Sequence, residues 1–588
     1  MTAFAARAAH PGKSVVPVYI VSDVGFGNEV FVVGTHRDLS SGGMMTPGVK
    51  LAWFSGNVWW GNIAVESGAT LQYQFVKHPG DNVGHCSGTS VALSSVLTLT
   101  APTADGPPYV AKRIRYTSSW SKVFILYRDN TTGSSWTDAA MIPIGAGRIA
   151  GEQVWEIRGI AAPGDEIEFV FHNDQSQYDN APAPPSNTAQ GAAPSVPMPY
   201  QGLSAPFNYR TPLDVLQVQD GQVFNYRPPA TVSAPRVENR AVGSTVTGIP
   251  GRNIHIWLPR GYDNNTWKRY PVVYFHDGQN VFFPGGTFGT WDADRIASYE
   301  TSQGRMREAI IVAVDNGNDY GSDRLKEYEP PGDIVSGYSG IADKYNQFLR
   351  DNVLPTLDYN YRTLNQPGQT ANPKNNIIAG SSMGGLVSAY IGRESSGVFG
   401  RIGIFSPALW AAPNYMANSL STAPKLPLQI YLDIGSAENS ASVSDSATYW
   451  NDAMNLYNIY LRLGYAVNTE LLFHPECGAN HNEQAWSRRL PGFFQYELSP
   501  WDEPQWLAAA LELPPLRLQS VDPAAGNATV NLLAPLGVPL VLESSTNLTT
   551  WSPWATPQTA SAIWQNMTIS GTSQPGGMRF WRARVTTP

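Results

Sequence analysis

Cysteine is almost absent from this chain, which holds only Cys86 and Cys477 among its 588 residues. Because the two lie in segments that we expect to form different domains, we expect neither a disulfide scaffold nor a thiol-based metal site. We expect no metal and no cofactor. Long apolar runs are missing as well, since none reaches the roughly 18 residues that a membrane-spanning helix needs. The sequence therefore predicts no membrane span.

Charge is also scarce. Charged residues make up 15% of the chain, and the net charge is −8. This balance provides no basic surface for nucleic acid, which we exclude as a partner. Aromatic residues reach 11%, with 18 tryptophans, a composition that suits β-rich modules and sugar-facing surfaces and argues against disorder. A chain of this length is too long for one core, so several domains are expected.

The first 14 residues lack the apolar core of a signal peptide. Lysine is nevertheless rare, and Asn, Ser, Thr and Trp are frequent, as in many exported proteins. We therefore expect a secreted or periplasmic protein whose leader peptide is not part of this sequence. No oligomeric state follows from the sequence.

Two N-terminal segments contain sets of short strands. In residues 15–104, Gly, Asn and Pro interrupt apolar strands at short intervals, which is typical of a β-sandwich. The pattern restarts over residues 111–230, where the Pro/Ala/Ser-rich tract 181–199 is expected to be a long loop. The strands expected in these two modules are 16–22, 29–35, 56–65, 70–78, 96–102, 121–129, 154–160 and 165–174. We predict two β-sandwich modules.

Residues 233–502 have a different sequence pattern, in which helix-like segments separate apolar strands. Nearly continuous apolar strands that alternate with helices predict a parallel sheet covered on both faces. The expected strands are 252–259, 270–278, 308–316, 375–381, 401–407 and 428–435, and the expected helices include 339–358 and 445–465. Residues 515–588 return to a β-like pattern, for which we expect a small C-terminal β domain.

One junction between a predicted strand and a predicted helix reads Gly380-Ser381-Ser382-Met383-Gly384. In this G-x-S-x-G pattern the glycines permit a sharp turn, and the strained central residue presents its hydroxyl at the top of the sheet. The following amide lies at a helix N-terminus, where negative charge is favoured. A tight turn without chemistry is the simpler interpretation. Because the strand and the helix supply the context that the motif requires, we predict that Ser382 is a nucleophile.

A serine nucleophile needs a base and an orienting acid, and in this fold the chain order is Ser, acid, His. Only His474 and His481 follow the serine. His474 ends a predicted strand, where we expect it to pack, whereas His481 lies in a Gly/Asn loop before a helix. A loop of that kind can bring an imidazole to the edge of the sheet, so we predict His481 as the base.

Three carboxylates compete for the role of the acid. Glu438 lies in the loop beyond the carboxyl end of strand 428–435, and we favour it. Asp433 within the strand and Asp445 farther along are the alternatives, and each of the three could instead be solvated or cap a loop.

Two backbone amides are expected to form an oxyanion hole. The first belongs to Met383. The second is expected at the end of the strand that begins at Tyr270, where the loop turns under the serine. Gln279 is the first candidate, and Asp277 or Gly278 the next. One such donor is worth roughly 10²–10³ in rate.

At these residues the chain resembles the esterase family of α/β-hydrolases that includes enterochelin esterases, feruloyl and acetyl-xylan esterases, esterase D and the mycolyltransferases. The resemblance spans about residues 235–500. It depends on segments that occur in the order of the family: 270–282, 289–296, 310–333, 377–410, 430–439 and 478–496. The serine of the family falls on Ser382 and its histidine on His481. Its acid, which varies between Asp and Glu among members, falls on Glu438.

The resemblance implies ester hydrolysis through an acyl-enzyme, without a metal. Ser382 attacks, His481 carries the proton and Glu438 steadies the imidazolium, while two amides hold the oxyanion. Loops near the carboxyl ends of the strands are expected to line the substrate pocket, although each tryptophan there could equally serve in packing. The candidates are Trp291, Asp292, Tyr328 and Trp410.

Both N-terminal modules resemble carbohydrate-binding families. Residues 15–104 are similar to a family 20 starch-binding domain, with Trp59 or Trp60 at the place of its central tryptophan. Tryptophans that the family uses for stacking are missing after 33–39 and within 79–90, so the resemblance predicts a fold and leaves the specificity open. The second module resembles family 25 or 53 starch-binding modules. There Tyr178 replaces a tryptophan and is either a sugar-stacking platform or a packed aromatic.

The sequence thus predicts a multidomain protein with two N-terminal β-sandwich modules, a central α/β-hydrolase domain and a small C-terminal β domain. We expect a serine carboxylesterase that acts on acylated or feruloylated polysaccharide. Aryl esters, polyesters and siderophore lactones are alternative substrates. A carbohydrate-binding protein with an inactive hydrolase domain is the alternative of a different class.

Overall fold

The computed structural model describes most of the chain up to residue 502 and shorter stretches beyond it. These residues are 13–25, 28–34, 48–53, 57–66, 68–79, 90–100, 112–130, 133–161, 165–184, 200, 207–226, 228–266, 268–317, 321–365, 371–422, 424–439, 442–502, 517–522, 527–533, 539–545, 552–553, 558–559, 564–569 and 580–585.

The first module consists of two antiparallel sheets around a shared core. One sheet has the order β1 (Lys13–Val21), β5 (Val58–Glu66), β4 (Ala52–Trp53). The other contains β3 (Val49–Lys50), β2 (Asn28–Gly34), β6 (Thr70–Pro79), β7 (Val91–Ala92) and β8 (Leu97–Thr100). Val16 and Val18 of β1 pack in one cluster with Val30 of β2 and Phe75 of β6. The two layers therefore bury each other's apolar faces, as in a sandwich.

The second module repeats this plan with two five-stranded sheets. The first contains β11 (Thr137–Ala140), β10 (Phe124–Asp129), β14 (Ile167–His172), β15 (Tyr178–Asp179) and β16 (Tyr209–Thr211). The second has the order β12 (Ile142–Ala146), β13 (Gln153–Arg158), β9 (Arg113–Ser118), β17 (Val215–Gln219), β18 (Gln222–Phe224). Ile114 of the second sheet and Phe169 of the first lie in one core.

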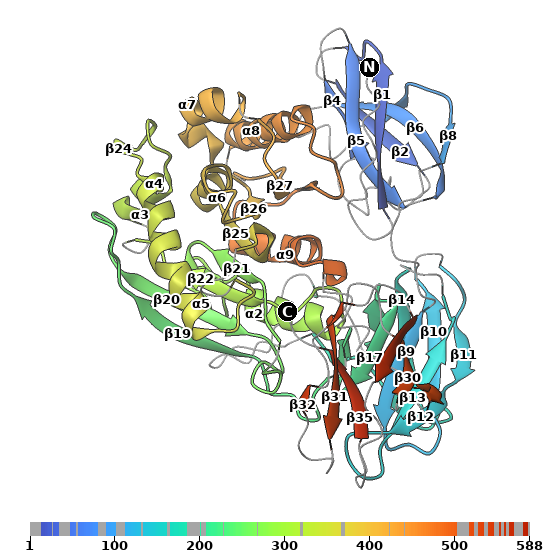
Figure 1. The fold of residues 1–588 in the computed structure, drawn as a ribbon. Coiled ribbons are helices and arrows are strands. Elements are labelled where there is room, and N and C mark those ends of the chain that lie inside the picture. Colours follow the sequence, from blue (N-terminus) through green and yellow to red (C-terminus); the bar gives the residue numbers. More distant parts are fainter. Residues whose placement is uncertain are drawn as a thin grey trace.

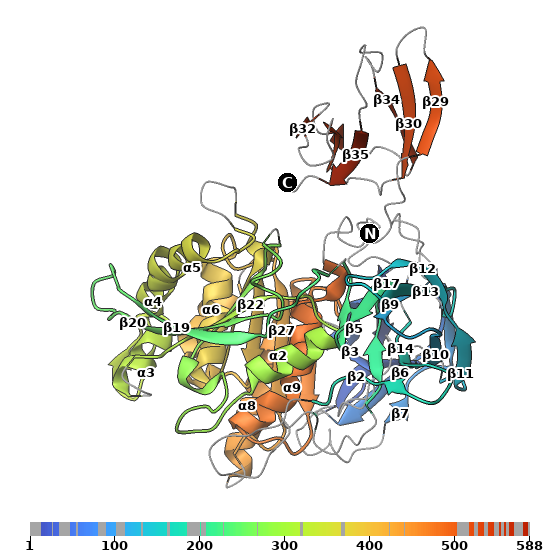
Figure 2. The same cartoon turned by 90° about the horizontal axis from the view of Figure 1, so that it is seen from below.

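The C-terminal strands form two small sheets. One contains β29 (Arg517–Asp522), β30 (Asn527–Leu533) and β34 (Trp564–Ile569), and the other contains β32 (Ser552–Pro553), β31 (Pro539–Ser545), β33 (Gln558–Thr559) and β35 (Phe580–Val585). Figure 2 shows these strands as a group of their own, away from the other sheets.

An eight-stranded sheet forms the central region. Its order is β19 (Arg236–Val242), β20 (Arg252–Leu258), β22 (Ile310–Val314), β21 (Val272–Phe275), β25 (Asn376–Ser381), β26 (Arg401–Phe405), β27 (Gln429–Gly435), β28 (Leu471–Glu476). β19, β20 and β22 pair antiparallel, and every neighbouring pair from β22 to β28 is parallel. The parallel strands put their carboxyl ends at one edge, where an active site is expected in an open α/β sheet.

Helices cover both faces of this sheet (Figure 1). One face packs against α2 (Ala293–Ser302) and α9 (Glu483–Glu497). The other packs against α3 (Ser322–Tyr328), α4 (Ala342–Phe348), η4 (Leu349–Val353), α5 (Leu354–Asn360), α6 (Met383–Glu394) and α8 (Val443–Arg462). Short elements complete the connections: η3 (Gly278–Asn280), β23 (Ile334–Val335), β24 (Tyr338–Ser339), η5 (Pro373–Asn375), η6 (Leu409–Ala411), α7 (Pro413–Tyr415), η7 (Met416–Leu420) and η8 (Pro500–Asp502).

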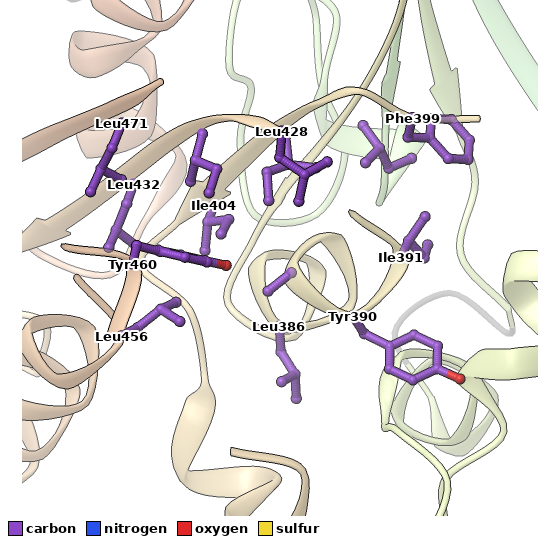
Figure 3. Packing of buried hydrophobic residues seen from close by; sticks show 14 of the residues in the cluster. Leu386, Tyr390, Ile391, Phe399, Ile404, Leu428, Leu432, Leu456, Tyr460 and Leu471 are labelled. Carbon is purple, nitrogen blue, oxygen red and sulfur yellow. The ribbon is translucent and has the colours of Figure 1, made fainter. Parts of the chain in front are cut away.

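Strand β21 shows why the two faces are both apolar. Val272 and Tyr274 belong to the cluster under α6 and α8, whereas Val273 and Phe275 belong to the cluster under α2 and α9. Successive side chains of a strand point to opposite faces, so a strand buried on both sides must be apolar throughout. Figure 3 shows one of these interfaces, where Leu386 of α6 lies below Ile404 of β26. Each such buried side chain stabilises the fold by about 1.5–3 kcal/mol.

The first module and the α/β region share one hydrophobic cluster. Tyr457 of α8 donates its hydroxyl to the carbonyl of Lys50 at 3.2 Å, and the Val467 amide donates to the carbonyl of Asn62 at 2.8 Å. The two regions are therefore packed together and joined by hydrogen bonds to backbone carbonyls of the first module.

The expectation about the cysteines is wrong for Cys477, which is disulfide-bonded. The other cysteine of the sequence, Cys86, lies outside the described residues. The local sequence pattern placed the two cysteines in different predicted domains, and it could not indicate that the first module and the α/β region pack together. Of the helices in the described ranges, none is both long and apolar enough to cross a membrane.

Candidate active site

Ser382 lies on the turn between β25 and α6. Its φ of 59° and ψ of −122° place it in a strained region of backbone space, and its side chain is partly exposed, whereas Ser381 is buried. A Cβ added at Gly380 would lie 2.9 Å from Cδ2 of His276. The glycine therefore allows the close approach that the turn requires.

His481 and Glu438 meet across two loops. Nδ1 of His481 lies 2.6 Å from Oε2 of Glu438, and the His481 amide donates to the Glu438 carbonyl at 3.2 Å. The imidazole is 20% exposed, while the carboxylate is buried. Burial acts to raise the pKa of Glu438, but the hydrogen bond and charge of His481 and the charge of Arg489 outweigh it, so this pKa is lowered. The site thus pairs an accessible imidazole with an ionised carboxylate.

The other two carboxylates have different partners. Asp433 is fully buried, and its Oδ2 accepts from Nε of Arg489 at 2.9 Å. Burial raises the pKa of Asp433 to about 6. Asp445 is exposed and pairs with Nδ2 of Asn439 at 3.0 Å.

The second histidine weighed from the sequence, His474, lies elsewhere. Its Nδ1 is 3.2 Å from the hydroxyl of Tyr431, and burial lowers its pKa to about 4. It is therefore a neutral packed residue near physiological pH.

Ser406 holds the far oxygen of Glu438. Its hydroxyl donates to Oε1 of Glu438 at 2.6 Å and accepts from Nε1 of Trp486 at 3.1 Å and from Nη2 of Arg489 at 2.9 Å. Ser406 could not be predicted from the sequence, since a serine after a strand carries no specific signal. Arg489 offered one: it is an arginine on the apolar face of a predicted helix, and such a buried charge needs a carboxylate partner.

Tyr449 of α8 packs against the histidine. Its ring centroid lies 4.9 Å from that of His481, and the ring of Trp410 meets it edge-on at 6.3 Å. The helix that follows the loop of Glu438 therefore covers one side of the candidate base.

The predicted oxyanion amides both lie at the start of helical turns. Met383 is the first residue of α6, so its N–H has no partner within the helix. Among the described residues, no acceptor is found for the Gln279 amide, whose side chain exchanges hydrogen bonds with Asn316. The Asp277 amide instead donates to the hydroxyl of Tyr328 at 3.2 Å, which leaves it occupied.

The predicted pocket residues differ in their burial. Trp291 is 4% exposed and packs against Phe405 and Trp486, so its placement fits a core residue. Tyr328 is fully buried below the loop of Asp277.

The other two pocket candidates also differ in burial. Asp292 is buried and pairs with Arg295 at 2.8 Å. Trp410 is 48% exposed and lies against Tyr449. Of the four predicted pocket residues, Trp410 is therefore the exposed one, and it lies beside the tyrosine that packs against His481.

The aromatic candidates of the modules are divided in the same way. Trp59 is buried in the core of the first module, and its Nε1 donates to the carbonyl of Ser22. Trp60 is half-buried, and Tyr178 is 49% exposed beside the ring of His172. No group of three or more His, Cys, Asp or Glu side chains suited to a metal ion occurs within the part of the chain that the structure describes.

Comparison with known families finds a match over residues 250–498, to the family described as "Putative esterase". A protein of Bacillus subtilis, "Uncharacterized protein YbbA", is 21% identical over 246 residues, which are 41% of this chain and 89% of that protein. An "Endo-1,4-beta-xylanase/feruloyl esterase" of Xylanibacter ruminicola is 25% identical over 201 residues, which are 33% of this chain and 24% of that protein.

Solved structures give similar matches. A CE1 ferulic acid esterase from Anaeromyces mucronatus is 22% identical and covers 48% of this chain and 99% of its own, with a TM-score of 0.34. An enterobactin esterase from Shigella flexneri is 12% identical and covers 84% of this chain and 95% of its own, with a TM-score of 0.35.

The family match supports ester hydrolysis as the reaction class of residues 250–498. Ser382, Glu438 and His481 all fall within that range. The candidate site and the family match therefore point to the same region of the chain.

Proposed function

We propose that the chain is a serine carboxylesterase that works through an acyl-enzyme. One observation carries the proposal: Nδ1 of partly exposed His481 lies 2.6 Å from the buried carboxylate of Glu438. In this arrangement Ser382 is the nucleophile, His481 the base and Glu438 the orienting acid. The family match over residues 250–498 supports the reaction class.

Each step uses groups of this site. Ser382 Oγ attacks the ester carbonyl carbon as His481 takes its proton, and the carbonyl electron pair moves to oxygen. The amides of Met383 and Gln279 stabilise that oxyanion. When the intermediate collapses, the leaving alcohol takes the proton from His481. Water then repeats the sequence on the acyl-enzyme and releases the acid.

We further propose an acylated or feruloylated polysaccharide as substrate of a secreted or periplasmic enzyme. The similarity to part of a xylanase/feruloyl esterase and the two N-terminal sandwiches support this choice. Half-exposed Trp410 lies edge-on to the tyrosine that packs against His481, and it supplies an aromatic surface that suits an aryl acyl group. Aryl esters, polyesters and siderophore lactones are alternative substrates of the same chemistry.

Turnover of p-nitrophenyl acetate and butyrate by the full chain tests the reaction. We expect Ser382→Ala to lower kcat by at least about 10³-fold, because no other group supplies the nucleophile. Ser381→Ala, the neighbouring buried serine, is the matched control and is expected to keep wild-type kcat. Equal turnover by Ser382→Ala and the wild type contradicts the proposal and favours a binding protein with an inactive hydrolase domain.

The substrate class needs a separate comparison. Initial rates on methyl ferulate, acetylated xylan and feruloylated arabinoxylan are compared with those on a polyester and on a siderophore trilactone. Preference for the polysaccharide esters supports the proposed substrate, and preference for the last two overturns it without affecting the reaction class.

A further inference from the structure

The turn η3, which carries the Gln279 amide, begins at a residue in an unfavourable backbone conformation. Asp277 has a φ of 55° and a ψ of 51°, in the left-handed region that a residue with a Cβ rarely adopts. Such a conformation persists only where the surrounding structure holds it. The contacts of the Asp277 side chain are therefore expected to fix how this turn presents its amide.

Arg324 of α3 holds both oxygens of the Asp277 carboxylate. Its Nε lies 2.6 Å from Oδ1, and its Nη2 lies 2.8 Å from Oδ2. Two parallel charge-assisted hydrogen bonds fix the orientation of a carboxylate in addition to pairing its charge. The two side chains are 13% and 12% exposed, so solvent screens the pair only weakly. This pair joins α3 to the start of η3.

The same carboxylate is connected to Gln279 through Asn316. Nδ2 of Asn316 donates to Oδ1 of Asp277 at 2.6 Å. The backbone amide of Asn316 donates to Oε1 of Gln279, and Nε2 of Gln279 donates to Oδ1 of Asn316, both at 3.2 Å. A continuous set of hydrogen bonds therefore runs from the guanidinium of Arg324 to the residue whose amide is the second oxyanion candidate.

The carboxylate also lies close to the first oxyanion candidate. A Cβ added at Gly384, the neighbour of Met383 in the first turn of α6, would lie 3.4 Å from Oδ2 of Asp277. An unpaired negative charge at this place would oppose the negative charge that develops on the substrate oxygen. Because Nη2 of Arg324 bonds to that same Oδ2, its positive charge offsets the carboxylate where it approaches α6.

We propose that Arg324 is a positioning residue for the oxyanion hole. It acts through Asp277: it holds η3 in the turn that presents the Gln279 amide, and it neutralises a carboxylate beside the N-terminus of α6. The inference rests on the proposed esterase function. Full charge on the substrate oxygen develops only as the transition state is reached, so the arrangement is expected to affect kcat and to leave KM nearly unchanged.

Arg324→Met tests the proposal, because it keeps most of the aliphatic stem and removes every donor. We expect kcat for p-nitrophenyl acetate to fall about 10²-fold, the effect of losing one oxyanion donor, with KM within about twofold. Arg324→Lys keeps the charge without the paired geometry and replaces Arg324→Met if that variant does not fold; its kcat is expected to fall about tenfold. Arg350→Met, at an exposed arginine of η4, is the matched control and is expected to keep wild-type kcat.

A transition-state analogue separates positioning from a merely structural role. When benzyl trifluoromethyl ketone reacts, Oγ of Ser382 bonds to the carbonyl carbon, the serine proton passes to His481, and the carbonyl electron pair becomes an oxyanion. We expect its Ki to rise in Arg324→Met by about the same factor as kcat/KM falls, since both depend on the oxyanion hole. A lowered kcat with an unchanged Ki overturns the proposal.

A double-mutant cycle tests whether Arg324 acts through Asp277. In the Asp277→Ala background, Arg324→Met is expected to have no further effect on kcat, because the group that the arginine orients is already missing. An equal loss of kcat in the wild-type and Asp277→Ala backgrounds overturns this role of the pair.

Rates are expressed per active site, counted from the burst amplitude, and Ser382→Ala is measured in parallel. Wild-type kcat in Arg324→Met, while Ser382→Ala is inactive, overturns this inference and leaves the esterase proposal standing. A kcat that returns to the wild-type value once unfolded molecules are discounted also overturns it. Full activity of Ser382→Ala overturns the esterase proposal itself.

Discussion

At Ser406 one hydroxyl serves three neighbours. It donates to Glu438 and accepts from Trp486 and Arg489, and its φ of 38° places it in the left-handed region. A hydroxyl has one proton to give, so the two acceptor bonds direct that proton to the carboxylate. Ser406 therefore fixes one oxygen of Glu438 while the other faces His481.

We expect Ser406→Ala to lower kcat about tenfold, because Glu438 loses a hydrogen bond to a charged group, worth about 1.5–3 kcal/mol. The free energy of unfolding is expected to fall by about 1–3 kcal/mol, since two buried donors lose their acceptor. Steady-state kinetics and urea denaturation measure the two effects.

Ser487→Ala is the matched control for that change. The hydroxyl of Ser487 is buried, and no partner for it is found among the described residues. Its removal is expected to leave kcat unchanged and to be neutral or slightly stabilising. A Ser406→Ala variant that behaves like this control contradicts the positioning role of Ser406.

Glu329 provides a pH test at the same scale. Both carboxyl oxygens are buried without a partner among the described residues, and burial raises its pKa to about 8. The folded state therefore holds a proton that the unfolded state loses above pH of about 4.5, so stability falls as pH rises from there to about 8.

At pH 8 we expect Glu329→Gln to unfold at a higher temperature than the wild type. Its free energy of unfolding is expected to be higher by at least about 1 kcal/mol, because each unit of pKa shift corresponds to about 1.36 kcal/mol. The two proteins are expected to converge at pH 5. Thermal unfolding monitored by circular dichroism across this range measures the difference. A constant offset between the two proteins at every pH is the outcome that this explanation does not allow.

At the residue scale, the sequence indicates candidates for the serine, the acid and the histidine, but it does not indicate which side chains pair with one another. The order of serine, acid and histidine limited the acid to Glu438, Asp433 and Asp445. Only the three-dimensional structure shows that Arg489 forms an ion pair with Asp433 and that Glu438 faces the imidazole of His481. Such pairings depend on loop paths, which local patterns do not encode.

The strand–turn–helix element β25–α6 depends on the close approach of backbones. A Cβ at Gly380 would lie 3.0 Å from the backbone of Gly384 as well as 2.9 Å from His276, and a Cβ at Gly385 would lie 2.7 Å from the Phe405 carbonyl. These glycines let the turn close tightly enough to hold Ser382 at positive φ.

We expect Gly380→Ala to push His276 and the turn apart and to lower kcat at least tenfold, because small displacements of a nucleophile cost large factors in rate. The matched control is Gly397→Ala, where nothing lies within 4 Å of the added Cβ. That change is expected to leave kcat unchanged. Steady-state kinetics of both variants measure kcat, and circular dichroism verifies that both are folded. Equal kcat values in the two variants contradict the role of Gly380 in the turn.

Elements with strong periodicity could be predicted from the sequence, and the exceptions have physical reasons. The buried strands of the central sheet and α8 were expected where they occur, because burial on both faces or on one helical face leaves a clear apolar pattern. Strand β19 was missed: Arg236–Val242 is polar and mostly exposed, and it lies at the edge of the sheet. Edge strands need little apolar surface, so their sequences resemble loops.

At the scale of the whole molecule, the first module is docked on the α/β region. The ammonium of Lys50, 3% exposed, pairs with Glu29 at 2.7 Å and reaches Oδ1 of Asn458 at 3.4 Å. Tyr457, the residue before Asn458 on α8, donates to the Lys50 carbonyl. Because the same helix carries Tyr449, the module braces the helix that packs against the candidate base His481.

We expect Lys50→Met, which keeps the aliphatic stem, to lower the free energy of unfolding by about 3 kcal/mol, since Glu29 loses its buried partner. Urea denaturation is followed by activity and by tryptophan fluorescence, and both midpoints are expected to fall together. Lys122→Met is the control: this lysine and its partner Asp174 are 67% and 68% exposed, so a change below about 0.5 kcal/mol is expected. A fall in the fluorescence midpoint alone contradicts the bracing of α8 by the module.

The packing of the domains against one another could not be predicted from the local sequence pattern. Shifts in composition separated the modules, but the contacts of Lys50 and Asn62 with α8 and Val467 join segments some 400 residues apart. The disulfide bond of Cys477 is another contact that the sequence pattern does not predict.

Covalent labelling of the nucleophile tests the central claim most directly. The native chain is treated with diethyl p-nitrophenyl phosphate, an organophosphate that reacts with activated serines, and the modified peptide is mapped by mass spectrometry. We predict one diethylphosphoryl group on Ser382, loss of esterase activity in proportion to its formation, and no label in Ser382→Ala. Stoichiometric inactivation with the label on any other residue, or full activity of a chain labelled at Ser382, contradicts the account.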